Sequence, residues 1–162
     1  MLLFDFTDAE QARLFHPIDD RVMGGVSASG LGTEGDHAVF SGEVSFENFG
    51  GFASVRSAPG SWDLSGMEGV ELLVLGDGKT YKFSITTDPR YDSVVYRARF
   101  QPPGGRWTSV RIPFTDFTPT FRGEAVPGVP DLDPSSIDTF GFLISDRQEG
   151  AFRLLLKTVK AY

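Results

Sequence analysis

The residues best suited to carry chemistry occur together in residues 19–27, which hold two adjacent carboxylates, a guanidinium and a pair of glycines. Asp19 and Asp20 precede Arg21, and Ser27 ends the stretch. Carboxylate and guanidinium groups form pairs of defined geometry, and paired glycines allow backbone conformations that other residues rarely adopt. Two interpretations follow. The stretch is either a polar corner that contacts a ligand or partner, or a loop held by its own Asp–Arg pair and turns.

Two further arginines and two tyrosines are candidate binding residues. Arg56 ends a short apolar segment, where it could orient a sugar hydroxyl, a carboxylate or a partner's backbone, or pair with one of the two aspartates. Arg122 is a second candidate contact in a proline-rich segment, with a solvated loop residue as the alternative. Tyr91 and Tyr96 carry rings that suit stacking on a sugar, and Tyr91 is the better platform because loops often carry function.

Residue types that commonly perform catalysis are scarce. The chain has no cysteine, which excludes disulfides, thiolate zinc sites and cysteine nucleophiles. The two histidines, His16 and His37, belong to no H-E-x-x-H motif, and no G-x-S-x-G nucleophile motif is present. We therefore expect no catalytic residue, no metal and no cofactor, and a noncatalytic protein rather than a hydrolase or lyase.

Length and charge narrow the class of protein. The 162 residues suit one domain spanning 1–162. A formal net charge of −7 disfavours nonspecific binding to nucleic acid, which needs a basic surface. No apolar run approaches the roughly 20 residues of a membrane span, and the start of the chain does not resemble a signal peptide. We therefore expect a cytoplasmic protein without a membrane span. Strand alternation predicts that a cluster of arginines occupies solvated outer positions: Arg90, Arg97, Arg99, Arg106 and Arg111.

The elements that position these residues are strands, because apolar residues recur with a period of two along the chain. The segment 94–100 places Tyr96 on an apolar face and Arg97 and Arg99 on the opposite face. Eight or more such segments predict an all-β sandwich or barrel. A capping box of Thr7 and Glu10 predicts a short helix over about residues 8–14, and residues 116–134 are expected to form one long surface loop. The expected strands are 38–46 (with Val44 and Phe46 on one face), 52–57, 70–75, 81–87, 94–100, 107–112, 140–145 and 152–159.

Three segments together resemble one known family, the complex I intermediate-associated protein 30 family, named for a mitochondrial assembly factor of the NADH:ubiquinone oxidoreductase. They are residues 19–27 (D-D-R-V-M-G-G-V-S), residues 50–56 (G-G-F-A-S-V-R) and residues 107–117 (W-T-S-V-R-I-P-F-T-D-F), the last followed by Arg122 and Gly123. The resemblance covers nearly the whole chain. It implies a jelly-roll β-sandwich of the galactose-binding-like type, and a binding or assembly role rather than a catalytic one.

Two functional hypotheses follow. The first is a noncatalytic domain that binds a protein partner, with a respiratory-complex subunit as the partner that the resemblance implies. Its contact would be one end of the sandwich, carrying Asp19, Asp20, Arg21, Ser27, Arg56 and Arg122. The second is a carbohydrate-binding module that holds a small sugar on a concave face through Tyr91, Tyr96 and polar neighbours.

Overall fold

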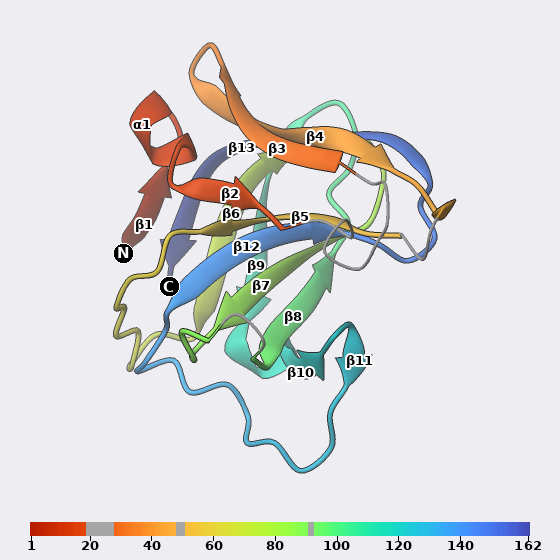
Figure 1. The fold of residues 1–162 in the computed structure, drawn as a ribbon. Helices are drawn as coiled ribbons and strands as arrows, with labels where there is room; N and C mark the ends of the chain where they lie inside the picture. The colour runs from red at the N-terminus through yellow and green to blue at the C-terminus, as the bar shows by residue number, and fades with distance from the viewer. Residues whose placement is uncertain (19–27, 48–50, 91–92) are drawn as a thin grey trace.

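The computed structural model describes residues 1–18, 28–47, 51–90 and 93–162 of the chain. Within these residues, two antiparallel sheets pack face to face as a β-sandwich, with a single α-helix of four residues (Figure 1). The all-β jelly-roll sandwich expected from the sequence is therefore confirmed.

The six-stranded sheet has the order β3-β4-β13-β6-β9, and β1 pairs with β13 beside this path. The long strand β13 connects most of this sheet, because it pairs with β4, β6 and β1. Its strands are β1 (Leu2–Asp5), β3 (Ala28–Glu34), β4 (His37–Val44), β6 (Gly69–Leu75), β9 (Trp107–Pro113) and β13 (Gly150–Ala161).

The seven-stranded sheet has the order β11-β10-β8-β7-β12-β5-β2, and it forms the front layer in Figure 1. Every neighbouring pair in this sheet is antiparallel. Its strands are β2 (Phe15–Pro17), β5 (Ala53–Ser57), β7 (Tyr81–Thr86), β8 (Val95–Phe100), β10 (Thr118–Phe121), β11 (Glu124–Ala125) and β12 (Thr139–Ile144).

The core lies between the sheets and is rich in aromatic rings. On β12, Phe140 and Phe142 alternate with outward-facing Gly141, and both rings are fully buried. The ring of Phe142 lies 5.1 Å from that of Phe83 on β7 and 6.5 Å from that of Phe40 on β4, centroid to centroid, so it joins the two sheets. The period of two in the sequence thus corresponds to one buried face per strand.

The expected short N-terminal helix is confirmed, but its predicted cap and the predicted extent of one strand were wrong. The helix α1 spans Ala9–Ala12 and is capped by Asp8, whose carboxylate accepts the Glu10 N–H at 3.0 Å. Thr7 is not the cap, and its own N–H and hydroxyl instead donate to Asp5 Oδ1, at 3.0 and 2.6 Å. The strand β4 ends at Val44, and Phe46 beyond it is 42% exposed rather than on the buried face.

The expected long loop over residues 116–134 was wrong in its first half. The short 3₁₀ helix η3 (Phe114–Asp116) leads into a hairpin of β10 and β11. Arg122 and Gly123 form its two-residue turn with φ of 51° and 83°, the combination that type I′ turns require. The rest of the segment lacks regular structure but is anchored, because Leu132 and Ile137 are buried and the Tyr96 hydroxyl donates to the Pro130 carbonyl at 2.9 Å.

Candidate functional site

Five residues singled out from the sequence lie outside the described part of the chain: Asp19, Asp20, Arg21, Ser27 and Tyr91. The predicted Asp–Arg pair and the predicted stacking of a sugar on Tyr91 therefore stay predictions. In the order of the chain, residues 19–27 connect β2 of the seven-stranded sheet to β3 of the six-stranded sheet.

Arg56 lies on the outer face of the seven-stranded sheet, because its neighbours Val55 and Ser57 are buried and successive side chains alternate between faces. Six neighbouring strands each contribute one residue that is paired with a residue of the adjacent strand. Together these six paired residues form a line across the outer face. We call this line the arginine row: Thr118 on β10, Arg97 on β8, Ser84 on β7, Gly141 on β12, Arg56 on β5 and His16 on β2.

Small residues separate the two arginines of the row. Ser84 and Gly141 lie between Arg97 and Arg56, and both are buried. Burial of Arg97 lowers the pKa of its guanidinium, the positive charge of Arg56 lowers that pKa further, and Asp146 opposes the shift. The two guanidinium groups therefore act on each other across the row.

Arg97 lines a cavity of about 290 Å³ at the β10 side of the face, which we call the Arg97 cavity. Lys82, Arg99 and Asp116 also line it, together with the hydroxyl-bearing Thr118 and Thr120. The Nε of Arg97 is buried and has no hydrogen-bond partner among the described residues. A buried donor without an acceptor costs free energy, so a ligand that supplies an acceptor to this nitrogen would be bound more favourably.

The other two cations of the cavity share one carboxylate. Asp146 accepts from Lys82 Nζ at 3.2 Å and from Arg99 Nη2 at 3.1 Å. Burial alone would raise the pKa of Asp146, but hydrogen bonds and charges from Lys82 and Arg99 outweigh burial and hold it below its usual value. Asp146 itself has a φ of 61° in the connection between β12 and β13, a conformation that aspartate tolerates better than most residues.

A second cavity of about 210 Å³ lies at the β2 side of the same face. Arg56 and His16 of the arginine row line it, with Thr86, Thr139 and Asp88. The hydroxyls of Thr86 and Thr139 are 2.5 Å apart. The outer face thus has two cavities, a polar one toward the β10 end of the arginine row and a more apolar one toward the β2 end.

The remaining described candidates lie apart from the row. Arg122 lies in the β10–β11 turn, where its guanidinium covers the ring of Phe121 at 5.3 Å from the centroid. Tyr96 faces the core and is only 6% exposed. The stacking role predicted for Tyr96 stays a prediction, and the burial of its ring does not favour it.

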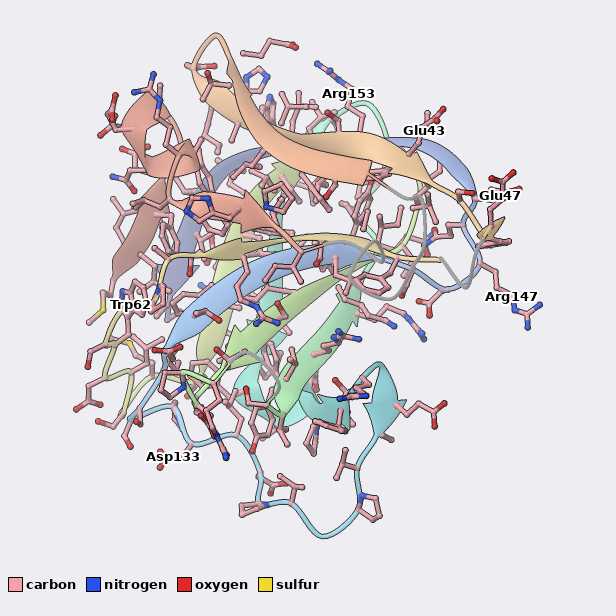
Figure 2. The ribbon with its side chains drawn as sticks, viewed as in Figure 1. Glu43, Glu47, Trp62, Asp133, Arg147 and Arg153 are labelled. Atoms are coloured by element: carbon pink, nitrogen blue, oxygen red, sulfur yellow. The ribbon has the colours of Figure 1, made fainter. Side chains whose placement is uncertain are left out.

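The rings of the two tryptophans, Trp62 and Trp107, both pack against other rings of the fold. Trp62 lies at the end of the sandwich near the two chain termini, opposite Arg147 (Figures 1 and 2). Its ring packs against Phe4 and Phe140, at centroid distances of 5.9 and 5.0 Å. Trp107 on β9 contacts the ring of His37 at 5.5 Å, on the six-stranded sheet.

The histidines do not combine into a site. His16 is exposed on β2, whereas His37 begins β4 of the other sheet. The Nε2 of His37 lies 3.8 Å from Glu34 Oε1, which is too long for a hydrogen bond. Within the described ranges, no group of three or more histidine, aspartate or glutamate residues is arranged to hold a metal ion.

Sequence reasoning recognised Arg56 but not the surroundings that make it part of a site. Arg97 and Arg99 were expected to be solvated, and Arg99 is exposed, but Arg97 is partly buried beside a cavity. The sequence did contain a signal for this site, because polar and cationic residues occupy the outward positions of two adjacent strands: Lys82 and Ser84 on β7, and Arg97 and Arg99 on β8.

The fold is that of the sandwich modules found in carbohydrate-active proteins. A family 11 carbohydrate-binding module from Clostridium thermocellum, solved with a β-1,3-1,4-mixed-linked tetrasaccharide, matches with a TM-score of 0.70 at 18% identity, covering 99% of this chain and 93% of that one. The family 11 module of the cellulase Lic26A-Cel5E from the same organism matches with a TM-score of 0.72 at 17% identity, covering 99% and 92%. At these identities the likeness establishes the fold.

Residues 4–156 match the sequence profile of the complex I intermediate-associated protein 30 family, and this chain belongs to that family. A Schizosaccharomyces pombe protein, the uncharacterised protein C9E9.15, is 31% identical over 182 residues, covering 99% of this chain and 83% of that protein. The mitochondrial complex I intermediate-associated protein 30 of Neurospora crassa is 23% identical over 125 residues, covering 74% of this chain and 45% of that protein. The resemblance inferred from the three motifs is confirmed.

One further property concerns membranes. Among the helices of the described residues, none has both the length and the apolar character needed to cross a bilayer.

Proposed function

We propose that this chain is a noncatalytic domain of the assembly-factor type, which holds a protein partner on the outer face of the seven-stranded sheet. The observation that carries the proposal is the arginine row, which brings Arg56 and Arg97 onto one face of a protein with a net charge of −7. Family membership supports the same role, since the Neurospora relative is named for its association with an intermediate of complex I.

A polar face with arginines suits recognition of a protein. Arginine is enriched in protein interfaces, and charged groups at such a surface contribute orientation and specificity more than raw affinity. A subunit of a respiratory complex is the partner that the family favours. The predicted contacts in residues 19–27 and at Arg122 belong to the same proposal. A cytoplasmic location also remains a proposal, and the name of the Neurospora relative places that relative in mitochondria.

Site-specific photo-crosslinking tests the proposed face. A photoreactive residue is introduced at Thr118, an exposed member of the arginine row, and in a second protein at Ser109, an exposed position on β9 of the other sheet. After irradiation in native lysate, we expect the probe at 118 to yield one discrete adduct that mass spectrometry identifies as a respiratory-complex subunit. The probe at 109 should yield none. Equal labelling from both positions, or no adduct from either, would contradict the proposal.

A carbohydrate-binding module is the second candidate, favoured by the fold shared with the family 11 modules. On this reading, a glycan would lie across the outer face, between the two cavities. Calorimetric titration with a β-1,3-1,4-linked tetrasaccharide and a glycan array test it. Heat of binding that disappears in Arg56→Gln would favour this candidate, and the absence of any glycan ligand would remove it.

A further inference from the structure

The Arg97 cavity combines open space with an unmatched donor. Its volume of about 290 Å³ exceeds what a carboxylate needs, and it is lined by two threonines as well as by charged residues. Arg97 contributes a partly buried guanidinium whose Nε has no acceptor among the described residues. By contrast, Arg99 and Lys82 are already paired with Asp146.

The charges around the cavity do not cancel. Among the described residues, Lys82, Arg97 and Arg99 supply three positive charges and Asp116 and Asp146 two negative ones, so that one positive charge remains. Lys82 and Arg99 share the carboxylate of Asp146, whereas Arg97 has an Nε without an acceptor among the described residues. Arg56 adds a further positive charge along the row.

We infer that the Arg97 cavity receives a single carboxylate from an acidic side chain of the protein partner. The inference rests on the proposed function and names the chemistry that the partner must present. A guanidinium offers parallel N–H donors that match the two oxygens of a carboxylate. Thr118 also lines the cavity, and its hydroxyl is a further donor for a carboxylate, whereas the Thr120 hydroxyl donates to the Val95 carbonyl at 2.7 Å.

The charge balance favours a carboxylate over a phosphate. A phosphomonoester carries nearly two negative charges at neutral pH, and Asp116 and Asp146 beside the cavity would repel the second charge. A neutral glycan would leave the charge of Arg97 uncompensated. A carboxylate matches the single remaining positive charge and supplies acceptors to Arg97.

The test follows the side-chain Nε–H signal of Arg97 by nitrogen-15 NMR, assigned through its loss in Arg97→Lys. The probe is the capped peptide acetyl-Gly-Glu-Gly-amide. The controls are the matching glutamine peptide, inorganic phosphate, and the variant Arg106→Gln, which removes an exposed arginine away from the cavity. We expect a saturable shift with the glutamate peptide, retained in Arg106→Gln, and no saturable shift with the glutamine peptide.

Other outcomes overturn the inference. An unmoved Arg97 signal would show that the cavity does not take a carboxylate, and tighter binding of phosphate would assign it to a different anion. Crosslinking from position 118 is repeated in Arg97→Lys, whose backbone spectrum reports whether it is folded. If this variant gives as much partner adduct as the unmodified protein, the proposed function is supported and the carboxylate inference is refuted. Loss of all adducts in the unmodified protein would sink the proposed function itself.

Discussion

At the scale of single residues, Gly141 decides whether the arginine row can form. A Cβ at this position would lie 2.6 Å from the Val55 carbonyl oxygen and 2.6 Å from Ser84 Oγ. The first of these neighbours is backbone, which cannot move without disturbing the pairing of β12 with β5. The glycine therefore allows β12 to pair with β5 and β7 in the middle of the arginine row.

We predict that Gly141→Ala lowers the free energy of unfolding by about 1–3 kcal/mol, the usual cost of forcing extra atoms into a packed site. The matched control is Gly30→Ala on the edge strand β3, where a Cβ would meet nothing within 4 Å. Because glycine in a strand is intrinsically less favourable than alanine, the control should be unchanged or slightly more stable. Urea denaturation of both variants measures the difference, and equal stabilities would refute the steric argument.

At the scale of elements, β12 is an interior strand of the seven-stranded sheet, between β7 and β5, and its aromatic side chains pack against the other layer. Phe142 is fully buried and its ring contacts those of Phe15, Phe40 and Phe83, at centroid distances of 6.1, 6.5 and 5.1 Å. The strand therefore contributes to both the sheet and the contact between sheets.

We predict that Phe142→Ala lowers the free energy of unfolding by about 3–5 kcal/mol, as for other buried phenylalanines replaced by alanine. Phe121→Ala removes a ring that is 39% exposed and should change stability by less than about 0.5 kcal/mol. Thermal and denaturant unfolding measure both, with Phe142→Leu as an intermediate variant if the alanine variant does not fold. A small loss from Phe142→Leu and Phe142→Ala alike would show that the ring is not part of the core.

The strands could be predicted from the sequence because the alternation that identifies them is local. Segment 94–100 assigned Tyr96 to the buried face and Arg97 and Arg99 to the outer face, and this is correct. The β10–β11 hairpin was missed because its turn is Arg122-Gly123, whereas the sequence signal for such a turn is usually Asn-Gly or Asp-Gly.

The site could not be predicted in the same way. Arg97 and Arg56 come to lie on one row through the register of β8, β7, β12 and β5. Arg56 and Arg97 are 41 residues apart in the sequence, and Arg97 and Gly141 are 44 residues apart. Local periodicity assigns each side chain to a face but does not encode which outward side chains lie opposite one another. The same gap hid the pairing of Asp146 with Lys82, which depends on contact between distant loops and strands.

At the scale of the whole molecule, the charges are distributed unevenly. The chain carries 22 acidic residues and 15 lysine and arginine residues. The outer face of the seven-stranded sheet nevertheless holds four basic residues: Lys82, Arg97 and Arg99 on the adjacent strands β7 and β8, and Arg56 on β5 beyond β12. Many of the acidic groups instead stabilise turns and strand connections through hydrogen bonds. The folded protein therefore depends on ionised carboxylates over much of its surface.

The pKa directions of these carboxylates predict acid sensitivity. Among the described residues, seven carboxyl groups have pKa values below their usual ones in the folded state, each through hydrogen bonds or opposite charges: Asp5, Glu34, Asp36, Asp63, Asp88, Asp133 and Asp146. A group with a lowered folded pKa binds fewer protons in the folded chain than in the unfolded chain. Its stabilising contribution is therefore present above the unfolded pKa, near 4, and is lost as the pH falls through the folded pKa.

We predict that the melting temperature is steady from pH 7 to about pH 5 and falls steeply between about pH 4 and pH 2. Asp5→Asn isolates one contribution, since Asp5 accepts from the Thr7 N–H and hydroxyl, and the amide keeps an acceptor while losing the charge. The variant should melt below the unmodified protein at pH 7, and the gap should narrow as the pH falls through the lowered pKa of Asp5. Calorimetry across this range measures both curves, with Asp116→Asn as the control because Asp116 is an exposed carboxylate of η3. A gap for Asp5→Asn that stays constant with pH would mean that its ionisation does not contribute to folding.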